Sequence, residues 1–501
     1  MTAFVSVPVL AYDLTILHTN DFHARFEPIS KYDSGCSAES NAEGKCFGGS
    51  ARLYTAINES RGRSANSILV DGGDQFQGTL YYTYYKGQLA AEMMNSLGYD
   101  AMTVGNHEFD DGPEVLAGFM QAVHFPVLMS NADVSLEPAL SKKLAKSAVI
   151  WRGGEAIGLI GVTPQNTDEL SSPGKFVKFS DPVAAVQSEV DSLTERGINK
   201  IVVLSHSGYH VDQKIAANTT GVDVIVGGHS NTYLSNVSDR AAGPYPTMVN
   251  GVAVVQAYAY GKFLGELNVS FDAQGNLTSA TGEPLIMDAG VEEDAMIKAH
   301  IGAASEPLET IRNTIVGQAK SAIDGSRENC RAKACEMGQL VTAAMLAKVA
   351  DQGVTIALQN GGGLRASLDA GDVTMGEVYT VLPFQNTLAT FEIDGATLVA
   401  ALENGVSKVE EGAGRFPQVA GIRFAFDASK AAGERVSDVE VAEGGSWVAI
   451  DSGKTYKAVT NNYVRNGGDG YKMLRNAKNA YDYGPDIAEV VADYIAANSP
   501  Y

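Results

Sequence analysis

The chain has 501 residues and carries 59 acidic against 37 basic side chains, which gives a formal net charge of -22 at pH 7. A chain of this length exceeds one ordinary hydrophobic core, so two domains are expected. The excess of carboxylates repels phosphate backbones and anionic lipids, which argues against a nucleic-acid polymer or a membrane surface as partner. A site for a small anion must therefore be locally positive.

The N-terminal region and the overall hydropathy bear on membrane attachment. No stretch approaches the roughly 18 to 20 continuous apolar residues that span a bilayer, so no membrane anchor is expected. The apolar run from Phe4 to Ala11 is equally compatible with a signal-peptide remnant and with a cloning scar.

The four cysteines fall into two local pairs, Cys36 with Cys46 and Cys330 with Cys335. This spacing favours two small disulfide-closed loops over a zinc site of four cysteines, which usually uses C-x2-C pairs. Disulfides persist in oxidising compartments, so a secreted or periplasmic protein is expected.

From about residue 12 to 230, short runs rich in Val, Ile and Leu alternate with helix-like segments, and a polar cluster follows each run. The runs cover residues 14–17, 68–70, 102–104, 201–204 and 222–226, and their clusters start at Asn20, Asp71, Gly105, Ser205 and Gly227. This pattern is typical of buried strands in a layered α/β sheet with a site along one edge. The polar clusters are expected to converge.

Residues 291–313 have apolar positions at helical spacing after an acidic start, which predicts a helix that links two domains. Pro307 lies inside this segment and predicts a kink or a break. Residues 315–501 then form a second αβ unit with strands of its own, among them 355–358 and 387–393.

Asp21-x-His23 alone is a weak signal, because an isolated His at a strand end is more often hydrogen-bonded than metal-bound. The polar residues after successive apolar runs, taken together, are a stronger signal of a metal site. After Asp21 and His23 come Asp74, then Asn106 and His107, and then one His after each of the last two runs, namely His206 and His229. Two metal ions roughly 3.5 to 4 Å apart need a bridging carboxylate with neutral ligands around it, and this set supplies both.

Asp74 is the natural bridging ligand, and the neutral amide of Asn106 limits the negative charge around the metals. The donors are nitrogen and oxygen without sulfur. This set suits Zn, Mn, Co or Fe and does not choose among them.

With these motifs in order, the sequence resembles the 5′-nucleotidase family of metallophosphoesterases over essentially its whole length. The matching motifs are residues 18–23 (HTNDFH), 73–78 (GDQFQG), 105–110 (GNHEFD) and 228–232 (GHSNT). The resemblance implies an α/β fold with three parts: a calcineurin-like four-layer α/β/β/α catalytic domain at 12–290, a linking helix and hinge at 291–313, and an α+β substrate-binding domain at 314–501.

The resemblance also implies two metal sites that share Asp74, with zinc as the favoured ion. The first set of implied ligands is Asp21, His23, Asp74 and Asn231, and the second is Asp74, Asn106, His206 and His229. His107, oriented by Asp110, is implied to stabilise charge on the phosphoryl group. The alternative is that His107 is a third ligand.

In the second domain, a Gly-rich turn with Arg follows an apolar strand, a pattern that suits a phosphate clamp or simply a tight turn. The resemblance favours a substrate site. Its implied members are Arg25, Arg331, Asn360, Gly362, Arg365, Phe384, Tyr463 and Asp469.

Phe384 and Tyr463 match two rings that sandwich the base in the family, and Asp469 matches the acceptor of the ribose hydroxyls. Without the resemblance, both rings are better explained as core residues. Tyr463 departs from the Phe of extracellular family members, which preserves stacking and leaves the base preference open.

The expected function is hydrolysis of nucleoside 5′-monophosphates, such as AMP, by a water molecule activated between two divalent metals. One alternative is a broader hydrolase for UDP-sugars, nucleoside diphosphates or 2′,3′-cyclic nucleotides. An alternative of another class is a nucleotide-binding protein without catalysis, against which the intact ligand set argues.

Overall fold

The computed structural model describes residues 12–501 except 32, 34, 385 and 483, so the apolar run from Phe4 to Ala11 lies outside the described residues. The chain divides into two compact units. The first comprises the chain up to Pro28, Ser37–Gln77 and Tyr85–Ala303, and the second comprises Ile29–Cys36, Gly78–Tyr84 and Ala304–Tyr501. The predicted boundaries at 290 and 314, and the hinge between them, stay predictions.

The first unit contains two six-stranded sheets. The first sheet has the order β14 (Leu277–Ile286), β13 (Phe263–Phe271), β1 (Tyr12–Thr19), β2 (Ser67–Asp71), β3 (Ala101–Thr103) and β4 (Val127–Leu128). The second has the order β11 (Thr247–Val249), β12 (Val252–Val255), β10 (Val224–Val226), β9 (Ile201–Ser205), β7 (Glu155–Val162) and β6 (Ser147–Arg152). The predicted runs between residues 12 and 230 are thus confirmed as strands.

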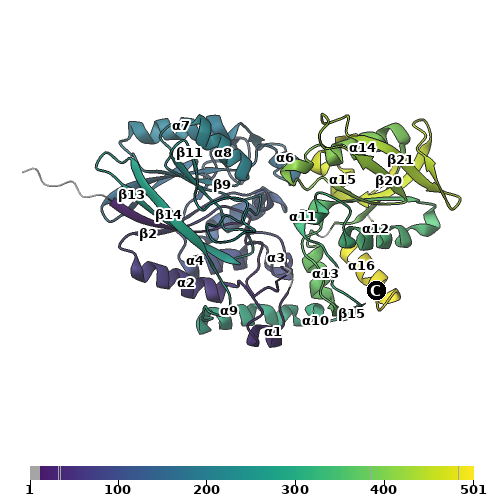
Figure 1. The fold of residues 1–501 in the computed structure, drawn as a ribbon, viewed down its shortest axis with the longest axis horizontal. Coiled ribbons are helices and arrows are strands. Elements are labelled where there is room, and N and C mark those ends of the chain that lie inside the picture. Colours follow the sequence, from purple (N-terminus) through teal and green to yellow (C-terminus); the bar gives the residue numbers. More distant parts are fainter. Residues whose placement is uncertain (1–11, 32, 34, 385, 483) are drawn as a thin grey trace, which may run out of the picture. The chain divides into compact units, whose positions relative to one another are not determined.

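The two sheets pack on each other, because side chains such as Ile16 and Val70 of the first share one buried core with Leu159 and Val202 of the second. Helices cover the outer faces, as Figure 1 shows. They are α2 (Ser50–Arg63) and α4 (Gln88–Leu97) on one side, and α7 (Pro182–Glu195) and α8 (Tyr209–Asn218) on the other. The predicted α/β/β/α layering of this unit is confirmed.

The strands that carry the polar clusters run parallel. β1, β2, β3 and β4 pair in parallel in the first sheet, and β7, β9, β10 and β12 pair in parallel in the second. Their carboxyl ends therefore meet at one edge of each sheet, where a ligand site is expected in α/β folds. Each predicted polar cluster follows such an end.

The segment predicted as a linking helix is helical with a break. α9 (Ala295–Ser305) gives way to the 3-10 turn η2 (Glu306–Leu308), and α10 (Glu309–Arg312) follows. Pro307 lies in the turn, where its missing N–H and fixed φ interrupt the α-helical hydrogen bonds. The predicted break is confirmed.

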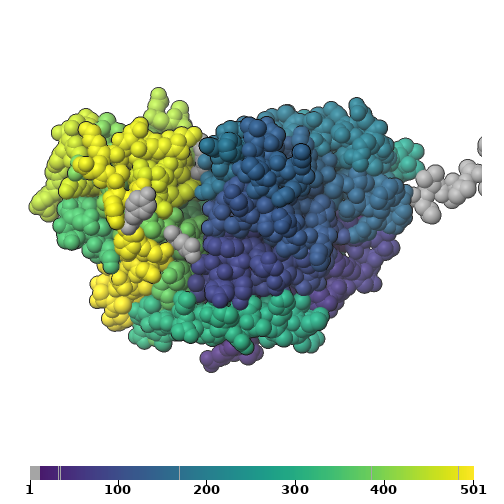
Figure 2. Space-filling view, turned by 180° about the vertical axis from the view of Figure 1, so that it is seen from behind, coloured from purple at the N-terminus to yellow at the C-terminus, as the bar shows by residue number. Residues whose placement is uncertain are grey.

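The second unit is built on a five-stranded mixed sheet with helices on both faces. Its strand order is β19 (Pro417–Ala420), β16 (Ile356–Asn360), β23 (Thr455–Asn461), β18 (Leu388–Asp394) and β24 (Lys478–Tyr481). The edge strand β24 is exposed along its length, and Figure 2 shows the yellow C-terminal stretch at the surface of this unit. The strands predicted at 355–358 and 387–393 are β16 and β18.

Two cores fill the second unit. One lies under α12 (Glu336–Lys348), α13 (Met375–Val381) and α16 (Ile487–Ala497), and the other lies under α14 (Gly395–Val406). Two smaller sheets complete it. They consist of β20 (Ile422–Phe426), β21 (Val436–Glu443) and β22 (Ser446–Ala449), and of β15 (Ile315–Ala319) and β17 (Gly371–Thr374).

All four cysteines are disulfide-bonded: Cys330 is joined to Cys335, and Cys36 and Cys46 are oxidised as well. This confirms the disulfide prediction and removes the zinc alternative, because a disulfide sulfur has no thiolate to offer a metal. Within the described part of the chain, no helix is long and apolar enough to cross a membrane.

Candidate metal centre and nucleotide site

The loop after β1 brings Asp21 and His23 into the interior, where each side chain is almost fully buried. Both residues have left-handed backbones, with φ of 50° and 53°. Side chains other than glycine rarely adopt this conformation, so contacts elsewhere must hold it. The amide of Asp21 donates to Gly73 O at 2.9 Å and that of His23 donates to Asp74 O at 3.0 Å, which ties this loop to the one after β2.

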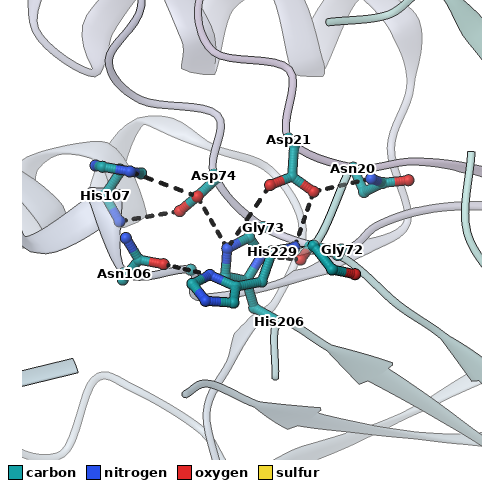
Figure 3. A network of polar contacts seen from close by, with 12 residues as sticks. Asn20, Asp21, Gly72, Gly73, Asp74, Asn106, His107, His206 and His229 are labelled. Atoms are coloured by element: carbon teal, nitrogen blue, oxygen red, sulfur yellow. Dashed lines mark hydrogen bonds and ion pairs between the residues drawn. The ribbon is translucent and has the colours of Figure 1, made fainter. Parts of the chain in front are cut away.

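Asp74 occupies the centre of the cluster (Figure 3) and is itself left-handed, with φ of 60°. Its Oδ1 accepts the backbone N–H of His107 at 2.9 Å. Its Oδ2 lies 2.9 Å from Nε2 of His206 and 3.8 Å from Nε2 of His23. One oxygen is thus fixed by the backbone, and the other lies nearest to the imidazoles of His206 and His23.

Backbone carbonyl groups fix the orientation of the imidazoles of His206 and His23. Nδ1 of His206 lies 2.6 Å from Gly72 O, and Nδ1 of His23 lies 3.0 Å from Phe76 O. A carbonyl can only accept, so each Nδ1 carries a proton, and the neutral form of each ring is the tautomer with its lone pair on Nε2. This tautomer is the one that a metal-binding histidine uses.

The residues after β3 and β10 close the cluster. Nδ1 of His229 lies 2.9 Å from Oδ1 of Asn106, and the amide of His229 donates to Oδ2 of Asp21 at 2.9 Å. Asn231 follows two residues later with a left-handed φ of 51° and a nearly buried side chain. Every predicted ligand except Asn231 is joined to another by one of these contacts.

Two groups of side chains place their ligand atoms within 4.8 Å of one another: Asp21, His23 and Asp74 in one, and Asp74, His206 and His229 in the other. Asp74 belongs to both. Two ligand groups with a common carboxylate are the arrangement that a pair of bridged divalent ions requires.

Two of these candidate ligand atoms lack a well-aligned hydrogen-bond partner within the protein. Nε2 of His206 lies close to Asp74 without the alignment of a hydrogen bond, and Oδ1 of Asn231 has no hydrogen-bond partner among the described residues. Buried polar atoms are costly when they are left in this state. Both observations are expected of side chains whose ligand atoms point at a common centre between them.

The charges also interact strongly. Burial alone would raise the pKa of Asp74, but His206, His107 and His23 together hold that pKa well below its ordinary value. Asp74 is therefore a carboxylate at neutral pH, the form that binds a cation.

His107 lies beside this cluster and forms a dyad with Asp110. Its Nδ1 is 2.6 Å from Oδ2 of Asp110, while its Nε2 is 3.9 Å from Oδ2 of Asp74. Ser171 donates from Oγ to the second oxygen of Asp110 at 2.6 Å. The carboxylate of Asp110 is thus held on both oxygens, and it presents His107 with Nε2 on the side of Asp74.

In the second unit, Asn360 ends β16 and the turn η4 (Gly361–Gly363) follows it. Nδ2 of Asn360 donates to Oδ2 of Asp469 at 2.7 Å. A Cβ on Gly362 would lie 2.9 Å from Cα of Gly414, so this close approach of two backbones requires glycine.

Asp469 also meets Tyr463. The amide of Asp469 donates to Oη of Tyr463 at 3.1 Å, and this hydroxyl lies 3.3 Å from Oδ1 of the same carboxylate. Asp469 has a left-handed φ of 51°, so it is another candidate residue held in a rarely adopted backbone conformation.

Three arginines among the predicted substrate residues have contacts of their own. The guanidinium of Arg365 lies 5.6 Å from the ring centre of Phe384, and Nη1 of Arg331 donates to Gly412 O at 3.4 Å. Arg25, in the first unit, lies 5.1 Å from the ring centre of Tyr260. The structure thus groups Tyr463 with Asp469 and Asn360, and it groups Phe384 with Arg365.

Comparison with known proteins decides the family. The family description "Calcineurin-like phosphoesterase" matches residues 14–233, and "5′-nucleotidase, C-terminal domain" matches residues 315–476. The chain is 39% identical to a 5′-nucleotidase of Diplobatis ommata, over 97% of this chain and 87% of that protein. The chain belongs to the 5′-nucleotidase family of metallophosphoesterases.

Two further relatives support this membership. A snake venom 5′-nucleotidase of Gloydius brevicauda is 37% identical over 98% of this chain and 88% of that protein. The crystal structure of a 5′-nucleotidase precursor from Thermus thermophilus superimposes with a TM-score of 0.93 at 43% identity and covers 97% of both chains. The predicted two-domain α/β fold is confirmed.

Three residues near the candidate metal centre had no role predicted from the sequence. Glu108 and Asp71 are fully buried carboxylates behind the loop of Asp74, and burial raises their pKa values to about 7 and about 8. Ser171 braces the His107 dyad from another part of the chain. The position of Glu108 inside the 105–110 motif could have indicated that it belongs to the site, whereas nothing in the sequence around Ser171 indicates its contact with Asp110.

Proposed function

We propose that this chain hydrolyses nucleoside 5′-monophosphates, such as AMP, to nucleoside and phosphate, with two divalent metal ions bound around Asp74. The observation that carries the proposal is the pair of ligand groups that share this one carboxylate. The names of the relatives above support the substrate class.

The proposed ligands of one ion are Asp21, His23, Asp74 and Asn231, and those of the other are Asp74, Asn106, His206 and His229. Bound there, two divalent ions would supply a nucleophile derived from water and polarise the phosphoryl oxygens. The family resemblance favours Zn for both ions, with Mn and Co as further candidates that the nitrogen and oxygen donors suit equally.

His107 is the proposed catalytic side chain beside the metals. Asp110 fixes the proton on Nδ1 at a distance of 2.6 Å and favours the cationic imidazole. Nε2 then carries a proton toward the region of Asp74, where it can donate to a phosphoryl oxygen as negative charge develops there. The dyad would add this stabilisation without changing the metal ligands.

The second unit is proposed to hold the nucleoside. Asp469 is buried and acts as an acceptor for the ribose hydroxyls, and Phe384 and Tyr463 supply rings for stacking with the base. Arg331, Arg365 and the turn at Asn360 and Gly362 supply cationic and N–H donors for anionic groups, as does Arg25 of the first unit. Stacking accepts any base, so selectivity among bases should be loose.

A substrate panel tests this proposal against its alternatives. Metal-free protein would be loaded with Zn or Mn and given AMP, ADP, UDP-glucose, 2′,3′-cyclic AMP and adenosine 3′-monophosphate, with phosphate and nucleoside measured. The proposal expects AMP to give the highest kcat/KM. Preference for one of the other four would replace the 5′-monophosphate assignment, and nucleotide binding without turnover would establish the non-catalytic alternative.

A secreted or periplasmic location is part of the same proposal. Both disulfides need an oxidising compartment, and one of the relatives is a venom protein. Detection of the mature chain in the culture medium or the periplasmic fraction would test it.

A further inference from the structure

Glu108 has no proposed role in the metal centre or in substrate binding, yet its side chain is fully buried beside Asp74. It lies in the short 3-10 helix η1 (His107–Phe109) after β3. An ionised side chain is rarely buried unless several donors compensate it. The donors that surround Glu108 therefore indicate what the side chain does.

The four donors to this carboxylate are backbone N–H groups, and they come from two loops. Oε1 accepts from Gln75 at 2.8 Å and from Phe76 at 3.1 Å. Oε2 accepts from Asp74 at 3.0 Å and from Gly105 at 2.6 Å. Three consecutive amides of the loop after β2 thus converge on one carboxylate that belongs to the loop after β3.

Converging backbone amides of this kind form a nest that binds anions in many proteins. Here the anion is a side chain of the protein itself. The nest includes Asp74, whose left-handed φ of 60° lies outside the range that its residue type prefers. The carboxylate of Glu108 is positioned to stabilise that conformation.

The contact between the two loops is reciprocal. The amide of Asp74 donates to Glu108, and the amide of His107 donates back to Oδ1 of Asp74. Gly105 lies so close that an added Cβ would overlap Oδ1 of Asp74. The loop that carries the shared carboxylate is therefore fixed against the loop that carries Asn106 and His107.

We propose that Glu108 is a positioning residue of the metal centre, which holds the backbone of residues 74–76 so that the Asp74 carboxylate faces both ligand groups. This inference rests on the proposed function only in requiring that metals bind there. A purely structural role would stabilise the folded chain without any effect on metal affinity.

The test compares Glu108→Gln with a matched control, Asp223→Asn. The Gln side chain has nearly the same shape, but its NH2 group faces two of the four amide donors whichever way it is turned. Asp223 is a partly buried carboxylate that also accepts a backbone amide, from Ile201 at 2.8 Å. It lies at the amino end of β9, whereas His206 follows the carboxyl end.

Metal-free proteins would be titrated with Mn²⁺, and Tm would be measured with and without saturating Mn²⁺. We expect Glu108→Gln to weaken Mn²⁺ binding by about 10 to 100-fold, the usual effect of losing a group that orients metal ligands. The rise in Tm that Mn²⁺ produces should shrink accordingly. Asp223→Asn should lower Tm equally in both forms and keep the wild-type Mn²⁺ affinity.

Glu108→Asp is the second variant, because it keeps the charge and withdraws the carboxylate by one methylene. We expect it to bind Mn²⁺ with an affinity between those of the wild type and Glu108→Gln. Wild-type affinity in either folded variant overturns the proposal. So does failure of both Glu108 variants to fold while Asp223→Asn folds, since Glu108 would then be part of the scaffold.

The result is separable from the proposed hydrolysis, because no nucleotide is present. A wild-type chain that binds no Mn²⁺ or Zn²⁺ would remove the metal centre and this inference together. Weakened binding in Glu108→Gln with no turnover of AMP by the wild type would support the positioning role and overturn the proposed substrate.

Discussion

The strand-end loops of the first unit and the turn and aromatic residues of the second unit differ in the chemistry of their candidate residues. Asp74 alone meets His206, His23 and His107. In the second unit, Asp469 meets the amide of Asn360, and the ring of Phe384 meets the guanidinium of Arg365. The first region is therefore built around one shared carboxylate, and the second around hydrogen-bonding groups and aromatic rings. Changes in the first should alter metal binding and kcat, and changes in the second should alter KM.

The largest effect is expected for Asp74→Ala. Without the shared carboxylate, the remaining ligands cannot hold two cations close together, because nothing offsets their repulsion. We expect activity on AMP to fall below detection and the metal content, measured by elemental analysis, to drop from two ions per chain. Asp223→Asn should retain both ions, and two ions retained in Asp74→Ala would contradict the bridging role.

His107→Ala should show whether His107 is a metal ligand or a catalytic group. The variant loses a donor to the transition state but no proposed ligand, so we expect kcat to fall by roughly 10² to 10³-fold with metal content unchanged. Steady-state kinetics and metal analysis on the same sample measure both. Metal loss that parallels the activity loss would show that His107 is a ligand, the alternative left open by the sequence.

Phe384→Ala tests the second region. Stacking on an aromatic ring stabilises a bound base by roughly 1 to 3 kcal/mol, which corresponds to roughly a 5 to 150-fold change in affinity. We expect KM for AMP to rise within this range while kcat and metal content stay near wild type. Phe384→Tyr keeps the ring and serves as the control. An unchanged KM in Phe384→Ala would show that Phe384 does not stack with the base and would favour the alternative that it is a core residue.

Tyr463→Phe should produce the smallest effect. The variant keeps the ring but loses the hydroxyl that contacts Asp469, and one hydrogen bond contributes about 0.5 to 1.5 kcal/mol. We expect KM for AMP to rise by roughly 2 to 10-fold. The rise should be absent with 2′,3′-dideoxy-AMP, which lacks the hydroxyls proposed to bind Asp469. An equal rise with both nucleotides would contradict the link between Tyr463 and ribose recognition.

The first region was largely predictable because its signal is local. Each proposed ligand follows a short apolar run, and a parallel strand delivers the residues after its carboxyl end to one edge of the sheet. The order of Asp21, Asp74 and His206 along the chain was therefore enough to predict that they converge, and the structure confirms it for the described contacts.

The second region was less predictable for a physical reason. A glycine-rich turn and two aromatic residues are common in cores and loops, so the residues around Asn360, Phe384 and Tyr463 pointed to a substrate site only through the family resemblance. Asp469 contacts Tyr463, six residues away, and also Asn360, 109 residues away, and no local pattern encodes the second contact.

The sequence by itself determined the alternation of strands and polar clusters, the set of proposed ligands, the cysteine pairs and the helix break at Pro307. Only the tertiary structure decided which carboxylates lie behind the proposed ligands. Glu108 meets the loop of Asp74, and Ser171 meets Asp110, through hydrogen bonds between segments that are distant in sequence. The left-handed backbones of Asp21 and Asp74 depend on such contacts too, because L-residues adopt them only where surrounding structure holds them in place.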